Sequence, residues 1–254
     1  MNNIHSFCET LSLNIKKKIK GLRVIPHLDI DQSFHCILIN FIICLRHYDA
    51  IRLLCKNNYH EDAIAIKRCM FESVLSLRLF IKEDINTIKW IVFSGYSKKA
   101  SRRFNVEEIR KDFTKNNIPH KYIEELFNIK YNKACLKYTW IGDKRQAAID
   151  VNLEREYYRS YKYSHSFIHP SGVFMDRFIR YDIKNKCLYL LLEPYEPFEN
   201  YISLLLLDSS LLLIKAVDAF NTKPKIFSVS RLERIDRALH KRLDLYIEKS
   251  KTKV

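Results

Sequence analysis

The chain has 254 residues, and its 44 Lys and Arg outnumber its 29 Asp and Glu, which leaves a formal charge of +15 at pH 7. Hydrophobic residues make up 47% of the sequence, enough to bury a sizeable core, and this excludes a globally disordered chain. The sequence has only four glycines and neither a Rossmann fingerprint nor a P-loop, which argues against nucleotide-driven motors, kinases and NAD enzymes of the common architectures.

We predict a mainly all-α fold, a helical bundle in a single domain over residues 1–254. Apolar residues at spacings of three and four predict helices over about 31–56 and about 60–82, which together form a long helical hairpin. Residues 94–145 contain many Lys and Arg with Asn-rich breaks. This composition predicts a basic helical insertion around the main bundle.

The second half of the chain is predicted to contain three helices and a hairpin. One helix runs from Asp150 to about His169 and ends before a proline. The period then changes, and residues 174–194 are predicted to form a small β-hairpin, rich in aromatic and branched side chains. Helices over about 197–221 and about 230–249 follow, and residues 223–254 carry the charge of a basic C-terminal helix.

Cysteine usage and hydropathy indicate the compartment. The seven cysteines are odd in number and include no CxxC pair, so we expect no zinc ribbon, no redox dithiol and no disulfide framework. The apolar stretches 34–45 and 201–217 are too short or too interrupted for a membrane span of roughly 20 residues, and buried core helices explain them better. We therefore expect a cytoplasmic protein that does not enter a membrane and that has no metal and no cofactor.

The helix predicted from Asp150 to His169 carries a row of polar side chains. At about 100° per residue, five of them fall within roughly an 80° arc: Arg155, Arg159, Lys162, Ser166 and His169. His165 lies at the edge of this arc, and it meets Arg159 only across a bend or a partner chain, as a homodimer would allow.

Such a row suits a phosphodiester, because guanidinium and ammonium bind phosphate and imidazole moves a proton near neutral pH. Metal-free RNA cleavage needs a base, an acid and cations beside the phosphorus oxygens. Arg159, His165 and His169 are therefore the candidate catalytic residues. Arg155, Lys162 and Ser166 are candidate nucleic-acid contacts. The alternative is a solvated helix face on which His169 only ends the helix.

Other basic clusters point to the same partner. Lysine and arginine gather in the C-terminal helix and in a second cluster, Lys98, Lys99, Arg102 and Arg103. Tyrosines interleave with the cations of residues 155–163, and this combination suits phosphate contact together with base stacking. RNA or another nucleic acid is the expected partner. The alternative is a generally basic composition without a specific partner.

Arg68 and Glu72 lie four residues apart on the second predicted helix, among apolar neighbours. A charged pair at this spacing satisfies itself as a structural ion pair. The alternative is an indirect role in the site, in which the pair orients a histidine of the later helix.

These residues carry a resemblance. The segment around Arg68-x-x-x-Glu72 and the segment YYRSYKYSHSFIHPSG at 157–172 resemble an uncharacterised bacterial helical family of the abortive-infection type, akin to HEPN ribonucleases. Arg159-x5-His165 is similar to the Arg and His spacing of HEPN toxins, although Ser160 stands where Asn, Asp or His commonly follows the Arg. The resemblance implies a helical dimer with a shared site that cleaves RNA without a metal.

We therefore expect a HEPN-like, metal-independent ribonuclease, a toxin or antiviral defence effector, with a companion protein of a defence or toxin–antitoxin system as a further partner. The first alternative is a non-catalytic nucleic-acid-binding or assembly subunit, in which the same cations only hold phosphates. The second is a small-ligand sensor with a pocket between helices.

Overall fold

The structure is a computed structural model, and within a few helix ends and in the two strands it describes the backbone alone. The described residues are 2–20, 32–83, 86–87, 90, 111, 114–115, 141, 143–164, 179–182, 187–190 and 199–251.

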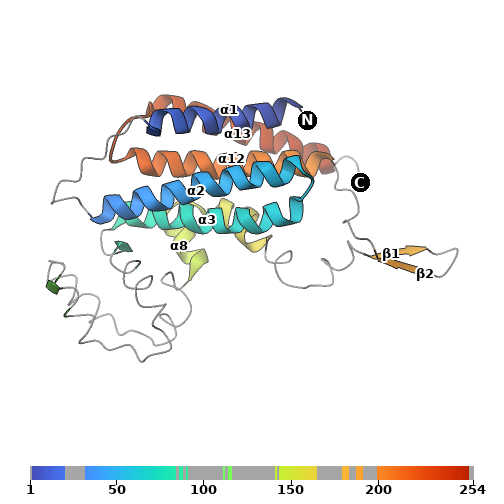
Figure 1. Cartoon of the computed structure of the whole chain (residues 1–254), viewed down its shortest axis with the longest axis horizontal. Helices are drawn as coiled ribbons and strands as arrows, with labels where there is room; N and C mark the ends of the chain where they lie inside the picture. The colour runs from blue at the N-terminus through green and yellow to red at the C-terminus, as the bar shows by residue number, and fades with distance from the viewer. Residues whose placement is uncertain are drawn as a thin grey trace.

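Five long helices form the bundle shown in Figure 1. They are α1 (Asn2–Lys20), α2 (Gln32–Lys56), α3 (His60–Lys82), α12 (Glu199–Asn221) and α13 (Val229–Lys251). Helices α2 and α3 pack side by side, and α12 packs against both of them and also against α1 and α13. Helix α12 is therefore the central element of the bundle.

The central position of α12 explains its composition. Its buried residues include an unbroken run from Leu205 to Ile214, so this helix is buried around its whole circumference there. On α12, Phe220 stacks on Phe41 of α2 with ring centroids 4.3 Å apart and planes inclined by 4°. Within the described part of the chain, no helix is long and apolar enough to cross a membrane.

The turn between α2 and α3 is a helix-stop motif made by asparagine. Asn58 adopts a left-handed backbone conformation with φ 63°, and the backbone N–H of Tyr59 donates to Leu54 O at 2.9 Å. This is the Schellman arrangement, in which a left-handed residue after the helix lets the next amide satisfy a free carbonyl. The chain reverses within three residues, and α3 then runs back along α2.

The predicted all-α character is confirmed, and helices α2, α3, α12 and α13 match predicted helices to within about two residues. Helix α1 was not predicted, although its buried Ile4, Cys8, Leu11 and Ile15 follow the helical spacing. Most of residues 94–145, the predicted basic insertion, lie outside the described residues.

The prediction of one helix from Asp150 to His169 is wrong. Asp150 is the last residue of α8 (Lys144–Asp150), and the chain then turns through Asn152, whose φ is 58°. The Leu153 amide donates to Ala148 O at 2.7 Å, which repeats the motif that ends α2. A short α9 (Glu154–Glu156) follows and continues as the π-helix η1 (Tyr157–Lys162).

Two strands lie within the range 174–194, β1 (Ile179–Asp182) and β2 (Cys187–Leu190). They pair antiparallel, with Ile179 opposite Leu190 and Asp182 opposite Cys187. Figure 1 shows the pair apart from the bundle, so it does not contribute to the core that positions the site.

Candidate functional site

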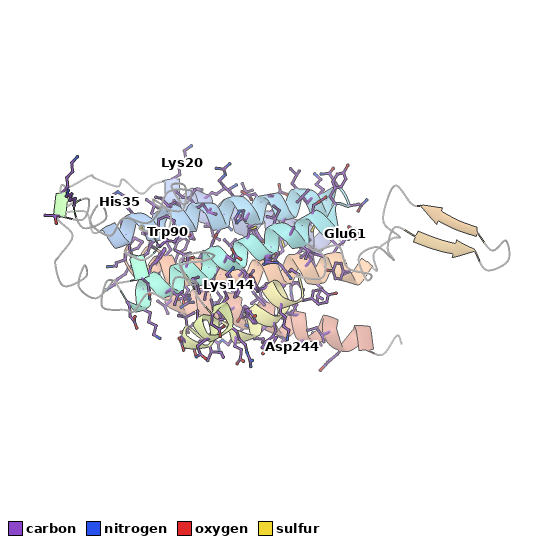
Figure 2. All side chains as sticks on the ribbon, turned by 90° about the horizontal axis from the view of Figure 1, so that it is seen from below. Lys20, His35, Glu61, Trp90, Lys144 and Asp244 are labelled. Carbon is purple, nitrogen blue, oxygen red and sulfur yellow. The ribbon has the colours of Figure 1, made fainter. Side chains whose placement is uncertain are left out.

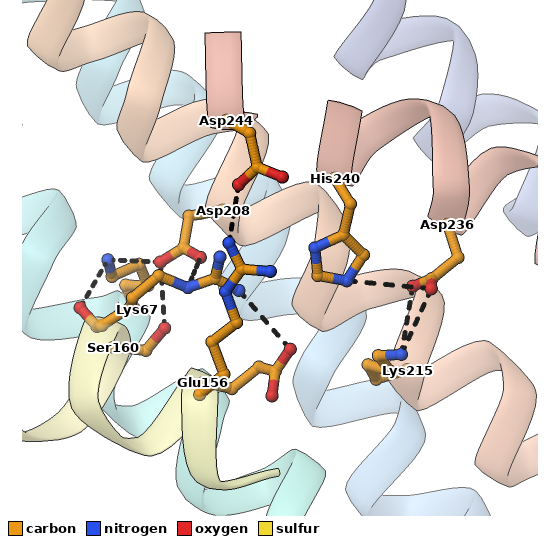
Figure 3. A network of polar contacts seen from close by, with 10 residues as sticks. Lys67, Glu156, Ser160, Asp208, Lys215, Asp236, His240 and Asp244 are labelled. Carbon is orange, nitrogen blue, oxygen red and sulfur yellow. Dashed lines mark hydrogen bonds and ion pairs between the residues drawn. The ribbon is translucent and has the colours of Figure 1, made fainter. Parts of the chain in front are cut away.

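A buried carboxylate on the central helix joins three elements of the bundle. Asp208 of α12 is 5% exposed, and its Oδ2 lies 2.8 Å from Lys67 Nζ of α3. The hydroxyl of Ser160 in η1 donates to the same oxygen at 3.1 Å. Arg159 Nε, also in η1, lies 3.2 Å from Asp208 Oδ1. Figure 3 shows the Asp208 carboxylate at the centre of these contacts.

The formal charges around Asp208 cancel. Glu156 is also 5% exposed, and its Oε1 lies 3.4 Å from Arg159 Nη2, so two cations face two carboxylates. Burial by itself would raise the pKa of Asp208, but the charges of Lys67 and Arg159 and the bond from Ser160 outweigh burial and lower that pKa below its ordinary value. Asp208 is therefore ionised at neutral pH. We call these five side chains the Asp208 network.

The π-helical turn places Arg159 in this network. Ser160 and Ser164 are buried, Ser164 Oγ donates to Ser160 O at 2.6 Å, and Lys67 Nζ donates to Arg159 O at 3.3 Å. The Tyr163 amide donates to Tyr158 O, which is the five-residue spacing of a π-helix. Single π turns within helices are frequent at functional sites. The turn is thus fixed by buried polar contacts with α3 and α12.

A second polar row connects the same segment to α13. Arg155 Nη2 lies 2.6 Å from Asp244 Oδ1, and Lys215 Nζ of α12 lies 3.2 Å from Asp236 Oδ1. His240 Nε2 is 3.8 Å from Asp236 Oδ2. The three α13 residues are spaced by four, so they share one helix face, and Figure 3 shows His240 between Asp236 and Asp244.

His240 makes the stability of the protein depend on pH. Burial lowers the pKa of His240, and Arg159, Lys215 and Arg155 lower it further, against an opposing effect of Asp236. The unfolded chain therefore binds more protons than the folded one near its ordinary pKa of about 6.5. We expect the free energy of unfolding to fall as the pH falls from about 7.5 to about 5.5, measured by urea denaturation.

A variant isolates the contribution of His240. Burial also lowers the pKa values of His47 and His5, so these histidines add to the same pH dependence. His240→Gln should reduce the loss of stability between the two pH values, whereas His35→Gln, at an exposed position on α2, should leave it unchanged. An equal loss in wild type and His240→Gln would show that this imidazole does not govern the effect.

Arg68 and Glu72 meet residues of α8 and η1. Arg68 Nε is 4.0 Å from Glu72 Oε1, whereas Lys144 Nζ is only 2.6 Å from the same oxygen. Both Arg68 Nη2 and Lys144 Nζ donate to the Tyr161 hydroxyl at 3.0 Å. The pair is therefore part of a four-residue cluster, and within the described residues its partner on the later segment is a tyrosine. Figure 2 shows Lys144 on the lower face of the bundle.

The predicted cations have different partners in the structure. Arg159 lies in the Asp208 network with 19% of its side chain exposed, and Arg155 pairs with Asp244 and is 52% exposed. Lys162 is exposed and lies over the Tyr158 ring, 5.3 Å from its centroid. The π turn changes the angle per residue, so the predicted 80° arc does not apply. The other predicted site residues lie outside the described residues: His165, Ser166, His169, Lys98, Lys99, Arg102 and Arg103.

Several residues of this site were not predicted from the sequence: Lys67, Glu156, Ser160, Asp208 and His240. The sequence does contain one indication of this site, because Asp208 interrupts a run of leucines. A carboxylate within such an apolar run is expected to be buried and therefore to need a charged or hydrogen-bonding partner. Lys67 likewise lies at helical spacing between Ile64 and Phe71, both fully buried. Among the described residues, no group of three or more His, Cys, Asp or Glu could hold a metal ion.

Comparison with known proteins gives a family and no function. A family model described as "Family of unknown function (DUF5677)" matches residues 34–186, more than half of the chain. The matched range includes α2, α3 and the segment with Arg159, and it ends before α12 and Asp208. No curated protein and no solved structure matches the chain. The chain belongs to the DUF5677 family, a family of unknown function.

Proposed function

We propose that the protein is a HEPN-like, metal-independent endoribonuclease that acts on RNA as a toxin or antiviral defence effector. Arg159, His165 and His169 are its proposed catalytic residues. One observation carries the proposal: the Asp208 network holds the Arg159 guanidinium in a fixed place on a π-helical turn, six residues before His165 in the sequence.

The proposed reaction is an intramolecular transesterification. One histidine takes the proton of the ribose 2′-OH, and the 2′ oxygen attacks the adjacent phosphorus. The other histidine protonates the leaving 5′ oxygen, so the products carry a 2′,3′-cyclic phosphate and a 5′-OH. Arg159 stabilises the charge that develops on the non-bridging phosphorus oxygens. No metal takes part in this scheme.

The fixed guanidinium suits this role. Hydrogen-bond donors stabilise a transition state most when they are already oriented, since they then need no rearrangement during the reaction. Asp208 and Glu156 lie within ion-pair distance of Nε and Nη2 of Arg159, while Nε and Nη1 are buried with no hydrogen-bond partner in the described part of the chain. A formal charge of +15 favours attraction of a polyanion.

The same proposal includes three further points: the protein acts as a homodimer, it has a companion protein of a defence or toxin–antitoxin system, and it is located in the cytoplasm.

The test is incubation of the purified full chain with total RNA and tRNA in EDTA. We expect cleavage that leaves cyclic phosphate ends and that is lost in His165→Ala and in His169→Ala, because one imidazole takes the 2′-OH proton and the other protonates the leaving oxygen. His35→Ala, at the exposed histidine of α2, is the matched control and should cleave as wild type does. Intact RNA with wild type, or equal cleavage by all variants, contradicts the proposal.

The second candidate is a non-catalytic nucleic-acid-binding or assembly subunit. It is favoured by the outer face of α13, where three exposed cations lie on the side away from the bundle core: Arg234, Arg237 and Lys241. Such a face would follow a phosphate backbone. Salt-sensitive binding of intact RNA by wild type, His165→Ala and His169→Ala alike would support this candidate.

A further inference from the structure

An exposed tyrosine next to Arg159 is flanked by two cations from different helices. Tyr158 of η1 is 37% exposed. Arg145 of α8 places its guanidinium carbon 5.6 Å from the centroid of the Tyr158 ring, and Lys162 of η1 places Nζ 5.3 Å from it. Arg145 is 13 positions from Tyr158 in the sequence, and the turn between α8 and α9 brings the two together.

The Tyr158 ring packs against a row of other aromatic rings. Its ring meets Tyr157 edge-on, with centroids 5.4 Å apart, and Tyr157 stacks on Tyr161 at the same distance with planes inclined by 22°. Both of these rings contact Phe71 of α3, which is fully buried. The Tyr158 ring therefore packs against aromatic residues that contact the core. Its side chain is already restricted, so it loses little conformational entropy when a flat ligand stacks on it.

The surroundings of this stack are cationic. The guanidinium of Arg68 and the ammonium of Lys144 lie 4.3 Å and 4.8 Å from the Tyr161 ring centroid, on the side of α3 and α8. Three carboxylates accompany these groups, since Glu72 binds Lys144, Glu154 lies 3.8 Å from Arg145, and the charge of Asp143 raises the pKa of Tyr157. With Lys162, the surface holds four cations against three carboxylates.

We propose that Tyr158, Arg145 and Lys162 form a platform for single-stranded RNA, on which one base stacks on the tyrosine and the cations contact the adjoining phosphates. An exposed aromatic side chain with cations at its ring is a combination by which proteins hold single strands, whereas the bases of a duplex are already stacked on one another. This proposal deepens the proposed function, because it names the form of RNA that reaches Arg159, the next residue in the chain.

Binding can be measured without cleavage. A fluorescent 2′-O-methyl RNA strand of about 12 nucleotides has no free 2′-OH, so transesterification cannot occur, and its length spans common site sizes. Fluorescence anisotropy in EDTA gives the affinity of the full chain for this strand. The same strand annealed to its complement and a strand with abasic positions are the comparison ligands. Binding of the strand therefore does not depend on whether the protein is a ribonuclease.

Tyr158→Ala should weaken binding about 5- to 150-fold, the range for loss of one base–aromatic stack. Tyr158→Phe keeps the ring and should stay within about 2-fold of wild type. Tyr59→Ala, at a 60% exposed tyrosine in the turn between α2 and α3, is the matched control and should not change the affinity. The duplex and the abasic strand should bind wild type more weakly, and Tyr158→Ala should not weaken abasic binding further.

The contributions of Arg145 and Lys162 are measured by the salt dependence of binding. Arg145→Ala and Lys162→Ala should each reduce the slope of log affinity against log salt by about 0.7, the value for one phosphate contact on a single strand. Equal binding by wild type and Tyr158→Ala, or equal binding of strand and duplex, would overturn the platform. Failure to cleave unmodified RNA, with Tyr158-dependent binding intact, would instead overturn the ribonuclease and leave the platform in place.

Discussion

Replacing Asp208 by alanine is expected to lower the free energy of unfolding by about 3–5 kcal/mol, the cost of removing one partner of a buried ion pair. The side chains of Lys67 and Arg159 are 7% and 19% exposed, so they would keep their charges in a site with little water and with one carboxylate fewer. Urea denaturation at neutral pH measures the loss. A thermal midpoint lower by about 10 °C should accompany it in a chain of this length.

A surface pair gives the matched control for Asp208. Asp218 lies on the same helix and binds Arg78 at 2.7 Å, but its side chain is 45% exposed. Asp218→Ala should therefore cost at most about 1 kcal/mol. The double change Lys67→Met with Asp208→Leu should recover part of the lost stability, because it removes both charges of the pair and leaves neither of them unpaired. A similar cost for Asp208→Ala and Asp218→Ala would show that the network does not hold the bundle together.

The main helices of this fold could be predicted from the sequence because their apolar residues repeat with the helical period. Helix α3 repeats apolar residues from Ala63 to Ile81, and its predicted ends at His60 and Lys82 agree with the structure. Helix α2 ends just before Asn57 and Asn58, close to its predicted end at residue 56, and the left-handed conformation of Asn58 gives the physical reason. Both signals are local, so a single sequence carries them.

The segment after α8 shows where local signals are insufficient. A continuous helix satisfies the side-chain pattern of residues 150–169, yet Asn152 takes the left-handed conformation and ends α8. The π turn that follows depends on bonds from Ser160 and Lys67 to groups far away in the sequence. A π-helix is rare enough that local preference alone does not predict it.

The site itself was only partly predictable, because its charges pair over long distances in the chain. Lys67 and Asp208 are 141 positions apart, and no local pattern assigns one to the other. Arg159 was identified as a member of a cationic row, but that assignment did not reveal that its partners are carboxylates inside the bundle. An acid within an apolar helix indicates that a partner exists, and only the packing of α3, α12 and η1 identifies it.

Replacing Arg159 by lysine tests whether the guanidinium acts on RNA or only holds the bundle. Lysine keeps the positive charge beside Asp208 but cannot reproduce the fixed planar fork of arginine. We expect cleavage to fall about 10²- to 10³-fold, the usual loss when one transition-state donor is removed, while urea denaturation shows a much smaller change than for Asp208→Ala. The rate of cyclic phosphate formation on unmodified RNA in EDTA is the measurement.

Arg155→Lys is the control for this change, because Arg155 lies in the same segment but is 52% exposed and pairs with Asp244 at the surface. It should retain most of the activity of wild type. If Arg159→Lys cleaves RNA as fast as Arg155→Lys does, the guanidinium does not touch the reacting phosphate. Arg159 would then be a structural residue that balances two buried carboxylates, and the catalytic cation would have to come from another part of the chain or from a partner chain.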